Sequence, residues 1–229
     1  DNYLQKGMIL FITLFFIMSL SILVLINLSD TSSYLLERNS KFTKSQLLYS
    51  VNNVKNEIIK ILDTTENREN LYKYLDIDFP LDLKDMKLII RLSEYDKYDI
   101  NVLNKNESEY IHFKDYLNSV GIYDFYTLQE SYSDFNNIEN TKQLETLLTK
   151  FNQKSYTENI FIAKEHIGFI KEYVKKDFNL KNEDKDIKFY ELFITIEYLN
   201  HIIKAYYILD KEGIRLKGEG VKYFEYSFK

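Results

Sequence analysis

The sequence contains no cysteine, a single proline (Pro80) and only six glycines among its 229 residues. Without cysteine, neither a disulfide nor a thiolate metal site is available, and cysteine usage gives no indication of redox compartment. The three histidines, His112, His166 and His201, are isolated and lack metal-ligand spacing. No Ser/His/Asp arrangement or phosphate-binding loop rises above chance, so the sequence does not predict an enzyme.

The sequence also lacks a strong excess of one charge, since the net charge is only −5 and no block of Lys or Arg stands out. We therefore predict no nucleic-acid partner. Calcium prefers several oxygen ligands on a turn, and two acidic clusters offer them without EF-hand spacing. Solvated loops are the favoured interpretation, so we predict no cofactor and keep calcium as the alternative. The clusters are Glu94/Asp96/Asp99 and Glu183/Asp184/Asp186.

One long apolar run is present near the start, in "QKGMILFITLFFIMSLSILVLINLSD" at residues 5–30. Its uncharged part, Met8–Leu28, would form a helix about 31 Å long, roughly the thickness of a bilayer hydrocarbon core. A secretory signal has a shorter apolar core, of about 7–15 residues, and ends in a small-residue cleavage site that is missing here. We therefore predict that residues 8–28 are the transmembrane half of a longer helix.

The helix should continue well beyond the apolar run, because no helix breaker occurs between Met8 and Pro80. After residue 29 the apolar residues recur at steps of four and three, which predicts an amphipathic half over 29–63. The simplest interpretation is one helix from Met8 to Asp63, whose narrow stripe packs on a sheet. The stripe consists of Leu47, Val51, Val54, Ile58 and Ile61, widened by Leu36, Phe42, Leu48 and Leu62.

The remaining sequence predicts strands on both sides of a helical segment. Residues 64–106 should be the first part of a sheet domain, 107–186 a helical insertion, and 187–229 the C-terminal strands. The fold class is thus α+β: a long N-terminal helix on a small antiparallel sheet, with an inserted α-helical domain. The expected elements are a hairpin of Lys87–Leu92 and Tyr98–Leu103, helices at Glu107–Val120, Phe125–Tyr132, Thr141–Gln153 and Thr157–Lys176, and strands at Phe189–Tyr198, His201–Leu209 and Val221–Phe228.

A short leader ending in Lys6-Gly7, followed at once by the apolar helix, resembles the type IV pilin-like superfamily. The resemblance implies that residues 1–7 are a leader peptide and that a prepilin peptidase cuts between Gly7 and Met8. It also implies N-methylation of Met8. Most pilins carry Glu at the fifth mature position, but Ile12 stands there in this chain. That absence is a feature of minor subunits at a filament tip.

Within the superfamily, the order of helix, hairpin, helical insertion and strands is similar to pseudopilin K of type II secretion systems (general secretion pathway protein K). The segment "YDINVLN" is also similar to the pseudopilin K segment that leads into the helical insertion, through Ile100, Asn101, Val102 and, one place late, Asn104. The resemblance implies a minor pseudopilin at the tip of a periplasmic pseudopilus, where it primes assembly for protein secretion. The protein would cross the bacterial inner membrane once, with its C-terminal domain in the periplasm.

The partners implied are other minor pseudopilins or pilins through the N-terminal helix, the prepilin peptidase, the inner-membrane assembly platform, and membrane lipid before assembly. Two alternatives stay open. The first is a minor type IV pilin that primes a pilus for adhesion or DNA uptake. The second, of another class, is a single-pass membrane-anchored periplasmic binding or sensor domain, which predicts an uncut anchor and a pocket in the outer domain.

Overall fold

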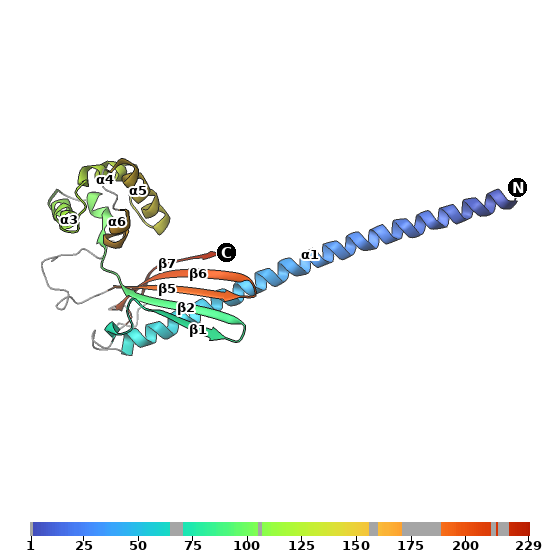
Figure 1. The fold of residues 1–229 in the computed structure, drawn as a ribbon, viewed down its shortest axis with the longest axis horizontal. Helices are drawn as coiled ribbons and strands as arrows, with labels where there is room; N and C mark the ends of the chain where they lie inside the picture. The colour runs from blue at the N-terminus through green and yellow to red at the C-terminus, as the bar shows by residue number, and fades with distance from the viewer. Residues whose placement is uncertain are drawn as a thin grey trace.

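The computed structural model shows a long helix and a mixed helix-and-sheet body from which the helix projects (Figure 1). Side chains are left undescribed at residues 1–17, 19, 105–109, 156–162, 171–188, 212–213 and 215–219, as well as at 65–70. The structure describes residues 2–64, 71–104, 107–155, 160–170, 189–211, 214 and 220–229.

The first element, α1, is an unbroken helix from Asn2 to Thr64. Leu47 and Val51 are fully buried against the sheet, and Val54 and Ile58 are partly buried beside them. The predicted stripe is wrong at Ile61, which is 49% exposed. Leu62 is buried in its place. The sheet twists beneath the helix, so the line of contact shifts around the helix and reaches Leu62 rather than Ile61.

Two residues expected to widen the stripe also lie elsewhere. Leu36 precedes the part of α1 that meets the sheet, and Phe42 lies on the opposite side of the helix, so both are exposed. Leu48 packs at the margin of the sheet-facing cluster. The sheet therefore covers α1 only from about Thr43 onward, and the helix before that point extends away from the body (Figure 1).

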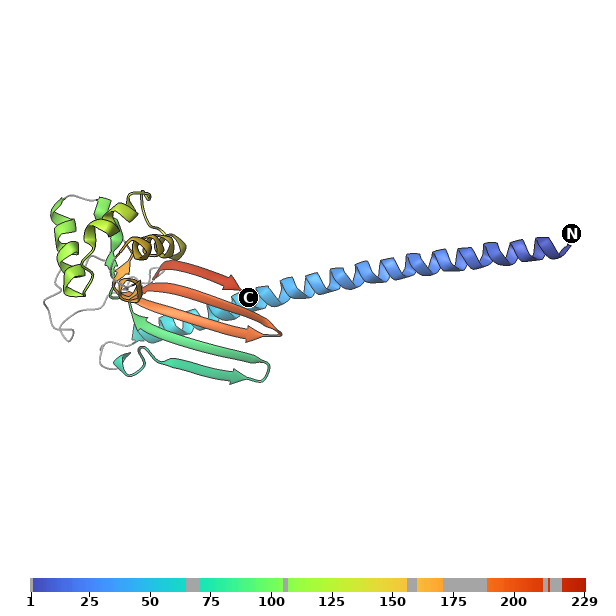
Figure 2. The same ribbon diagram turned by 45° about the horizontal axis from the view of Figure 1, so that its top comes forward.

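A five-stranded antiparallel sheet forms the centre of the body, with strand order β1-β2-β5-β6-β7. One of its faces packs against the second half of α1, and alternate apolar residues of β5 line this core. Figure 2 shows α1 running beneath the strands. The strands are β1 (Asp78–Leu83), β2 (Met86–Glu94), β5 (Phe189–Tyr198), β6 (His201–Asp210) and β7 (Val221–Phe228).

The predicted hairpin of Lys87–Leu92 with Tyr98–Leu103 is wrong in its second member. β2 pairs instead with β1, in the register Pro80↔Ile89, and with β5 on its other side. Tyr98–Asp99 is a short strand, β3, which pairs with β4 (Ile167–Gly168) in a separate two-stranded sheet. The sequence analysis missed β1 because Pro80 disfavours a strand interior, whereas an edge strand tolerates proline.

The helical insertion lies between β2 and β5, at the end of the sheet opposite the projecting half of α1 (Figure 1). Its core continues onto the outer face of the sheet, where it meets Phe189 and Ile208. The last predicted helix, Thr157–Lys176, is shorter than expected, since it ends at His166 and the chain continues as a strand. The end of the predicted range, residues 171–176, lies outside the described residues. The insertion comprises η1 (Ile100–Asn104), α3 (Glu107–Ser119), α4 (Phe125–Tyr132), α5 (Thr141–Lys154) and α6 (Ile160–His166).

Candidate functional site

The projecting part of α1 exposes an unusual amount of apolar surface. Large apolar side chains of this segment are 49–68% exposed, although soluble monomers rarely leave contiguous apolar surface uncovered. Exposed apolar surface of this extent is typical of a segment that contacts lipid or another protein. The exposed side chains are Met18, Leu20, Ile22, Leu23, Val24, Leu25, Ile26, Leu28, Tyr34, Leu35 and Leu36.

The residues predicted for processing lie at the start of this helix. The backbone at Lys6, Gly7, Met8 and Ile12 is helical, and their side chains are outside the described residues. Over the residues whose side chains are described, no helix has a stretch both long and apolar enough to cross a bilayer. Most of the predicted membrane run, Met8–Leu28, falls outside the part to which that finding applies.

A second apolar seam, which the sequence analysis did not identify, runs along the side of α1 that faces away from the sheet. Its members recur every seven residues at Leu28, Leu35, Phe42 and Tyr49, and they are 65%, 51%, 63% and 71% exposed. A seven-residue repeat keeps these side chains on one side of the helix, where a second helix could lie along them, while the positions three residues further on are polar, at Thr31, Arg38, Ser45 and Asn52. The seam could have been found from this spacing, but Phe42 was assigned to the sheet-facing stripe instead.

The flanks of the seam are polar but mostly uncharged, with Ser45, Gln46 and Asn53 beside it. The Ser45 hydroxyl donates to the backbone carbonyl of Lys41 at 3.0 Å, so it is satisfied within the helix. Neutral flanks let a second helix approach without burying an unpaired charge, which would be costly. α1 therefore has two apolar sides: one already covered by the sheet, the other open.

The joint between sheet and insertion is built around Asn101 in η1, a residue of the segment quoted for its resemblance to pseudopilin K. Asn101 is buried, and its side-chain oxygen accepts hydrogen bonds from the Ile138 N–H at 2.7 Å and the Tyr132 hydroxyl at 3.0 Å. Its side-chain amide donates to the Ile138 carbonyl and to Asp99, each at 3.0 Å. One side chain thus holds together η1, the end of α4 and the loop before α5.

The other residues of the same segment complete this joint. Ile100 and Val102 are fully buried in the insertion core, while the Asn104 amide donates to the Tyr132 hydroxyl at 2.8 Å. Burial, and secondarily the charge of Asp99, raises the pKa of Tyr132 to about 12. Tyr132 therefore stays a neutral donor at ordinary pH. The arrangement positions the insertion on the sheet and has no reactive group aimed at solvent.

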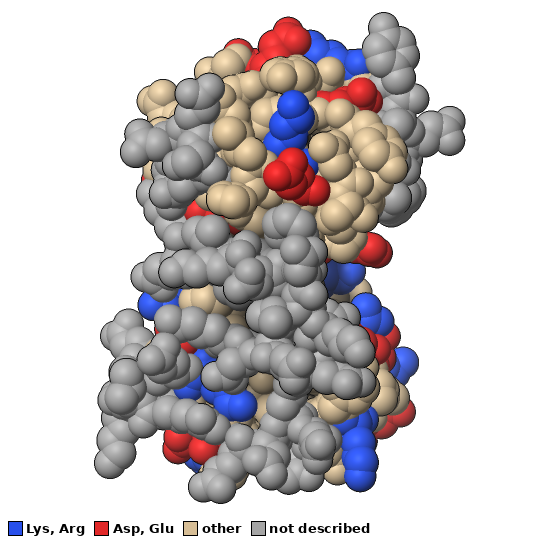
Figure 3. Space-filling model, turned by 90° about the vertical axis from the view of Figure 1, so that its left-hand side faces the viewer, with Lys and Arg blue, Asp and Glu red and all other residues tan. Residues whose placement is uncertain are grey.

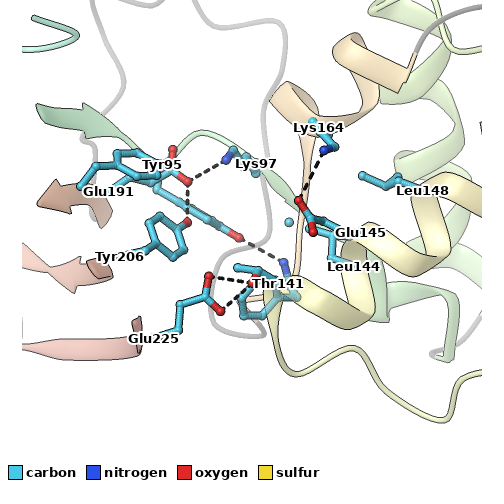
Figure 4. Close-up of a pocket in the computed structure, with 13 residues that line it drawn as sticks. Tyr95, Lys97, Thr141, Leu144, Glu145, Leu148, Lys164, Glu191, Tyr206 and Glu225 are labelled. Carbon is cyan, nitrogen blue, oxygen red and sulfur yellow. Dashed lines mark hydrogen bonds and ion pairs between the residues drawn. The ribbon is translucent and has the colours of Figure 1, made fainter. Parts of the chain in front are cut away.

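A cleft of about 410 Å³ separates the outer face of the sheet from α5 and α6 (Figure 4). Glu191 of β5 lies at its sheet side, where it forms an ion pair with Lys97 at 2.6 Å and accepts a hydrogen bond from the Tyr206 hydroxyl at 2.5 Å. Burial, and then the nearby Glu191 carboxylate, raises the pKa of Tyr206. Glu191 alternates with the α1-facing residues of β5 and so lies on the other face of the sheet, where the insertion covers it and leaves it only 6% exposed.

The opposite side of the cleft is formed by the start of α5. The Thr141 hydroxyl donates to the Glu225 carboxylate of β7, at 2.7 and 2.6 Å to its two oxygens, and the Tyr223 hydroxyl donates to the same carboxylate at 2.7 Å. Asn140 caps α5 by accepting from the Gln143 N–H at 2.9 Å. A carboxylate next to a helix N-terminus is favourably placed, so Glu225 helps to dock the insertion on the sheet.

The charged groups of this cleft are therefore mostly engaged with one another. Lys164 pairs with Glu145 at 3.4 Å, and Lys97 pairs with Glu191, as Figure 4 shows. No nucleophile lies beside a base there, and the described residues contain no group of three or more potential metal ligands. These ion pairs and hydrogen bonds hold the insertion against the sheet.

The two acidic clusters considered for calcium differ in how much of them the structure describes. Asp99 turns inward and accepts from the Asn101 backbone N–H at 2.9 Å, while residues 183–186 lie outside the described residues. His166 is bonded to the Tyr116 hydroxyl through its Nδ1 atom at 2.9 Å. Figure 3 views the end of the molecule farthest from the start of α1, where the described acidic and basic side chains of the insertion are interspersed.

Comparison with known proteins returned no matching family model, no matching curated protein and no matching solved structure.

Proposed function

We propose that the protein is a minor pilin-like subunit, specifically a minor pseudopilin that sits at the tip of a periplasmic pseudopilus and primes its assembly for type II secretion. The observation that carries this proposal is the design of α1, which is continuous from the apolar run to the sheet and has a second, open seam. The sheet-facing side holds the subunit's own body. The open side is available to the helices of neighbouring subunits.

A simple membrane anchor would not require that second seam. Leu35, Phe42 and Tyr49 lie beyond the predicted membrane run Met8–Leu28, where lipid cannot cover them. Covering one exposed aromatic ring of this kind contributes on the order of 2–3 kcal/mol of association free energy. Several such residues on one line favour helix-to-helix packing outside the bilayer.

The position of the insertion supports a place at the tip. It lies at the end of the body opposite the projecting helix (Figure 1), so its bulk would not obstruct helices that pack along α1 from below. Ile12, at the fifth mature position, gives no carboxylate to pair with the N-terminus of a subunit above it. Both features fit a subunit with no neighbour above.

The minor type IV pilin stays the closest alternative, since it would use α1 in the same way. The cleft of about 410 Å³ favours a second class, a membrane-anchored binding domain. We rank that class lower because the polar groups lining the cleft already pair with one another.

The test is the N-terminus of the protein extracted from membranes after co-expression with a prepilin peptidase. We expect mass spectrometry to show a chain beginning at a methylated Met8. Gly7→Val should abolish the cut, and the matched variant Thr13→Val, inside the apolar run, should leave it unchanged. Wild-type protein that remains uncut beside an active peptidase would refute the proposal and favour a permanent anchor.

A further inference from the structure

The two edges of the main sheet differ in a way that indicates a binding function for one of them. β1 forms one edge and carries Pro80 at its centre. Proline has no N–H, so this edge lacks a donor in the middle and resists pairing with another strand. β7, at the other edge, has no proline and is rich in aromatic residues, at Tyr223, Phe224, Tyr226 and Phe228. Figure 2 shows it at the rim of the sheet.

The register of β6 and β7 fixes which backbone groups point out of the sheet. Ile202 and Lys229 exchange two hydrogen bonds, at 3.2 and 2.9 Å. Because hydrogen-bonded and non-hydrogen-bonded pairs alternate in an antiparallel ladder, the backbone groups of Phe224, Tyr226 and Phe228 point away from β6. No described backbone group bonds to them from that side. Three donors and three acceptors therefore line the open edge.

The side chains of the same residues form a row of rings on the α1 side of the sheet. Phe224 stacks on Tyr207 with ring centroids 4.4 Å apart, and the centroids of Phe224 and Tyr226 are 5.6 Å apart. Tyr226 meets Phe228 at 5.7 Å, and the Lys44 ammonium lies over the Phe228 ring. Phe224 and Tyr226 nevertheless remain 42% and 48% exposed, so the row ends in open apolar surface at the edge.

We propose that the β7 edge binds an extended segment of a different polypeptide, which adds a sixth, antiparallel strand to the sheet. Backbone bonds to Phe224, Tyr226 and Phe228 supply affinity, and alternate side chains supply specificity. On the α1 side the segment places apolar residues against the row of rings. On the other side it places a basic residue near Glu225, whose carboxylate accepts hydrogen bonds from the neutral hydroxyl groups of Thr141 and Tyr223.

A second copy of this chain does not fit the edge, and this step rests on the proposed function. A symmetric antiparallel β7–β7 pair would point the two α1 helices in opposite directions, so both could not enter one membrane. A side-by-side copy in the same orientation would offer its β1 edge, where Pro80 removes the central donor. The occupant is therefore a different chain.

The test uses the full chain in detergent micelles and a fluorescently labelled, end-blocked peptide of eight residues with alternating valine and threonine and one lysine. We expect saturable binding of this peptide, measured as an increase in its fluorescence anisotropy. The same peptide N-methylated at alternate positions, which removes the donors that face β7, should bind at least about tenfold more weakly. Equal binding of the two peptides would overturn the proposal.

Two variants at one position locate the binding. Tyr226→Pro removes an outward N–H but no bond to β6, and should weaken peptide binding by about tenfold or more. Tyr226→Val keeps the N–H and should bind within about threefold of wild type, since only ring contact is lost. Circular dichroism reports whether each variant folds. If Tyr226→Pro unfolds, the N-methylated peptide on wild-type protein still decides the question.

The oligomeric state separates the remaining outcomes. Dimerisation in sedimentation experiments that Tyr226→Pro abolishes would show that a second copy is the occupant, contrary to the proposal. Failure of N-terminal processing would refute the proposed function, yet would leave the comparison of the two peptides to decide whether the edge binds a strand.

Discussion

The joint at Asn101 allows one substitution to be analysed quantitatively. Asn101→Leu keeps the approximate volume of the side chain but removes both its amide and its oxygen. The Ile138 N–H and carbonyl, bonded to Asn101 at 2.7 and 3.0 Å, would then be left in the core without these partners. The Tyr132 hydroxyl would lose its 3.0 Å acceptor and keep the Asn136 carbonyl at 3.5 Å and its contact with Asn104.

The cost follows from the number of groups left without partners. Each buried polar group that loses its only partner costs about 1–3 kcal/mol, so two backbone groups cost roughly 2–6 kcal/mol. The leucine recovers part of this through apolar burial, which leaves a net loss of about 3 kcal/mol. Because domain stabilities are roughly 5–15 kcal/mol, the effect is large. For a chain of this size it corresponds to a fall in Tm of about 6–12 °C.

The assay is thermal unfolding of the full chain in detergent, followed by near-ultraviolet circular dichroism, which reports the packing of tyrosines such as Tyr98 and Tyr116 in the insertion core. Asn53→Leu, on the exposed side of α1, is the matched control and should leave Tm within about 2 °C. A decrease in Tm of less than about 2 °C for Asn101→Leu would refute the reasoning, because the joint would then not depend on these hydrogen bonds.

Four further predictions follow from the same structure. Leu62→Ala should cost about 2–5 kcal/mol in denaturant unfolding, while Ile61→Ala costs less than about 1 kcal/mol, because only Leu62 is buried. Gly168→Ala should destabilise the chain by about 1–3 kcal/mol in the same assay, since a Cβ there would overlap the Tyr95 hydroxyl. Burial raises the pKa of Tyr207 to about 12, so phenolate absorbance should show late ionisation, and stability should fall as pH rises above about 10. Phe42→Ser should leave Tm within about 2 °C yet reduce crosslinking to co-expressed pilin-like subunits, and a large fall in Tm would show that Phe42 packs within the monomer.

The parts of the fold that the sequence predicts well are those set by local periodicity. Along β5 the apolar residues Leu192, Ile194 and Ile196 recur at every second position, and all three face α1. The unbroken helix also follows from local composition, since nothing before Pro80 would end it. The helices of the insertion begin within a few residues of their expected positions because their apolar spacing is regular.

The features that were missed depend on which surfaces meet in three dimensions. Glu191 has the sequence context of an exposed strand residue, and only the insertion, which arrives from a distant part of the chain, buries it against Lys97. The choice between Ile61 and Leu62 depends on the angle at which α1 crosses a twisted sheet. Tyr98–Leu103 looks like a strand, yet Asn101 bends the chain into η1 because its side chain finds partners near Ile138.

The open seam of α1 and the joint at Asn101 belong to one mechanical design. In the proposed function, the body would connect helices packed along α1 to the part of the subunit that stands at the tip. Two cores carry that connection here: one between α1 and the sheet, including Leu47 and Val51, and one in the insertion that reaches Phe189 and Ile208 on the outer face of the same sheet. Because well-packed interiors are stiff, these two cores oppose movement of the insertion relative to the sheet. Continuous packing from α1 through the sheet to the insertion suits the proposed place at a filament tip, because the distal domain would then keep a fixed position relative to the helices packed along α1.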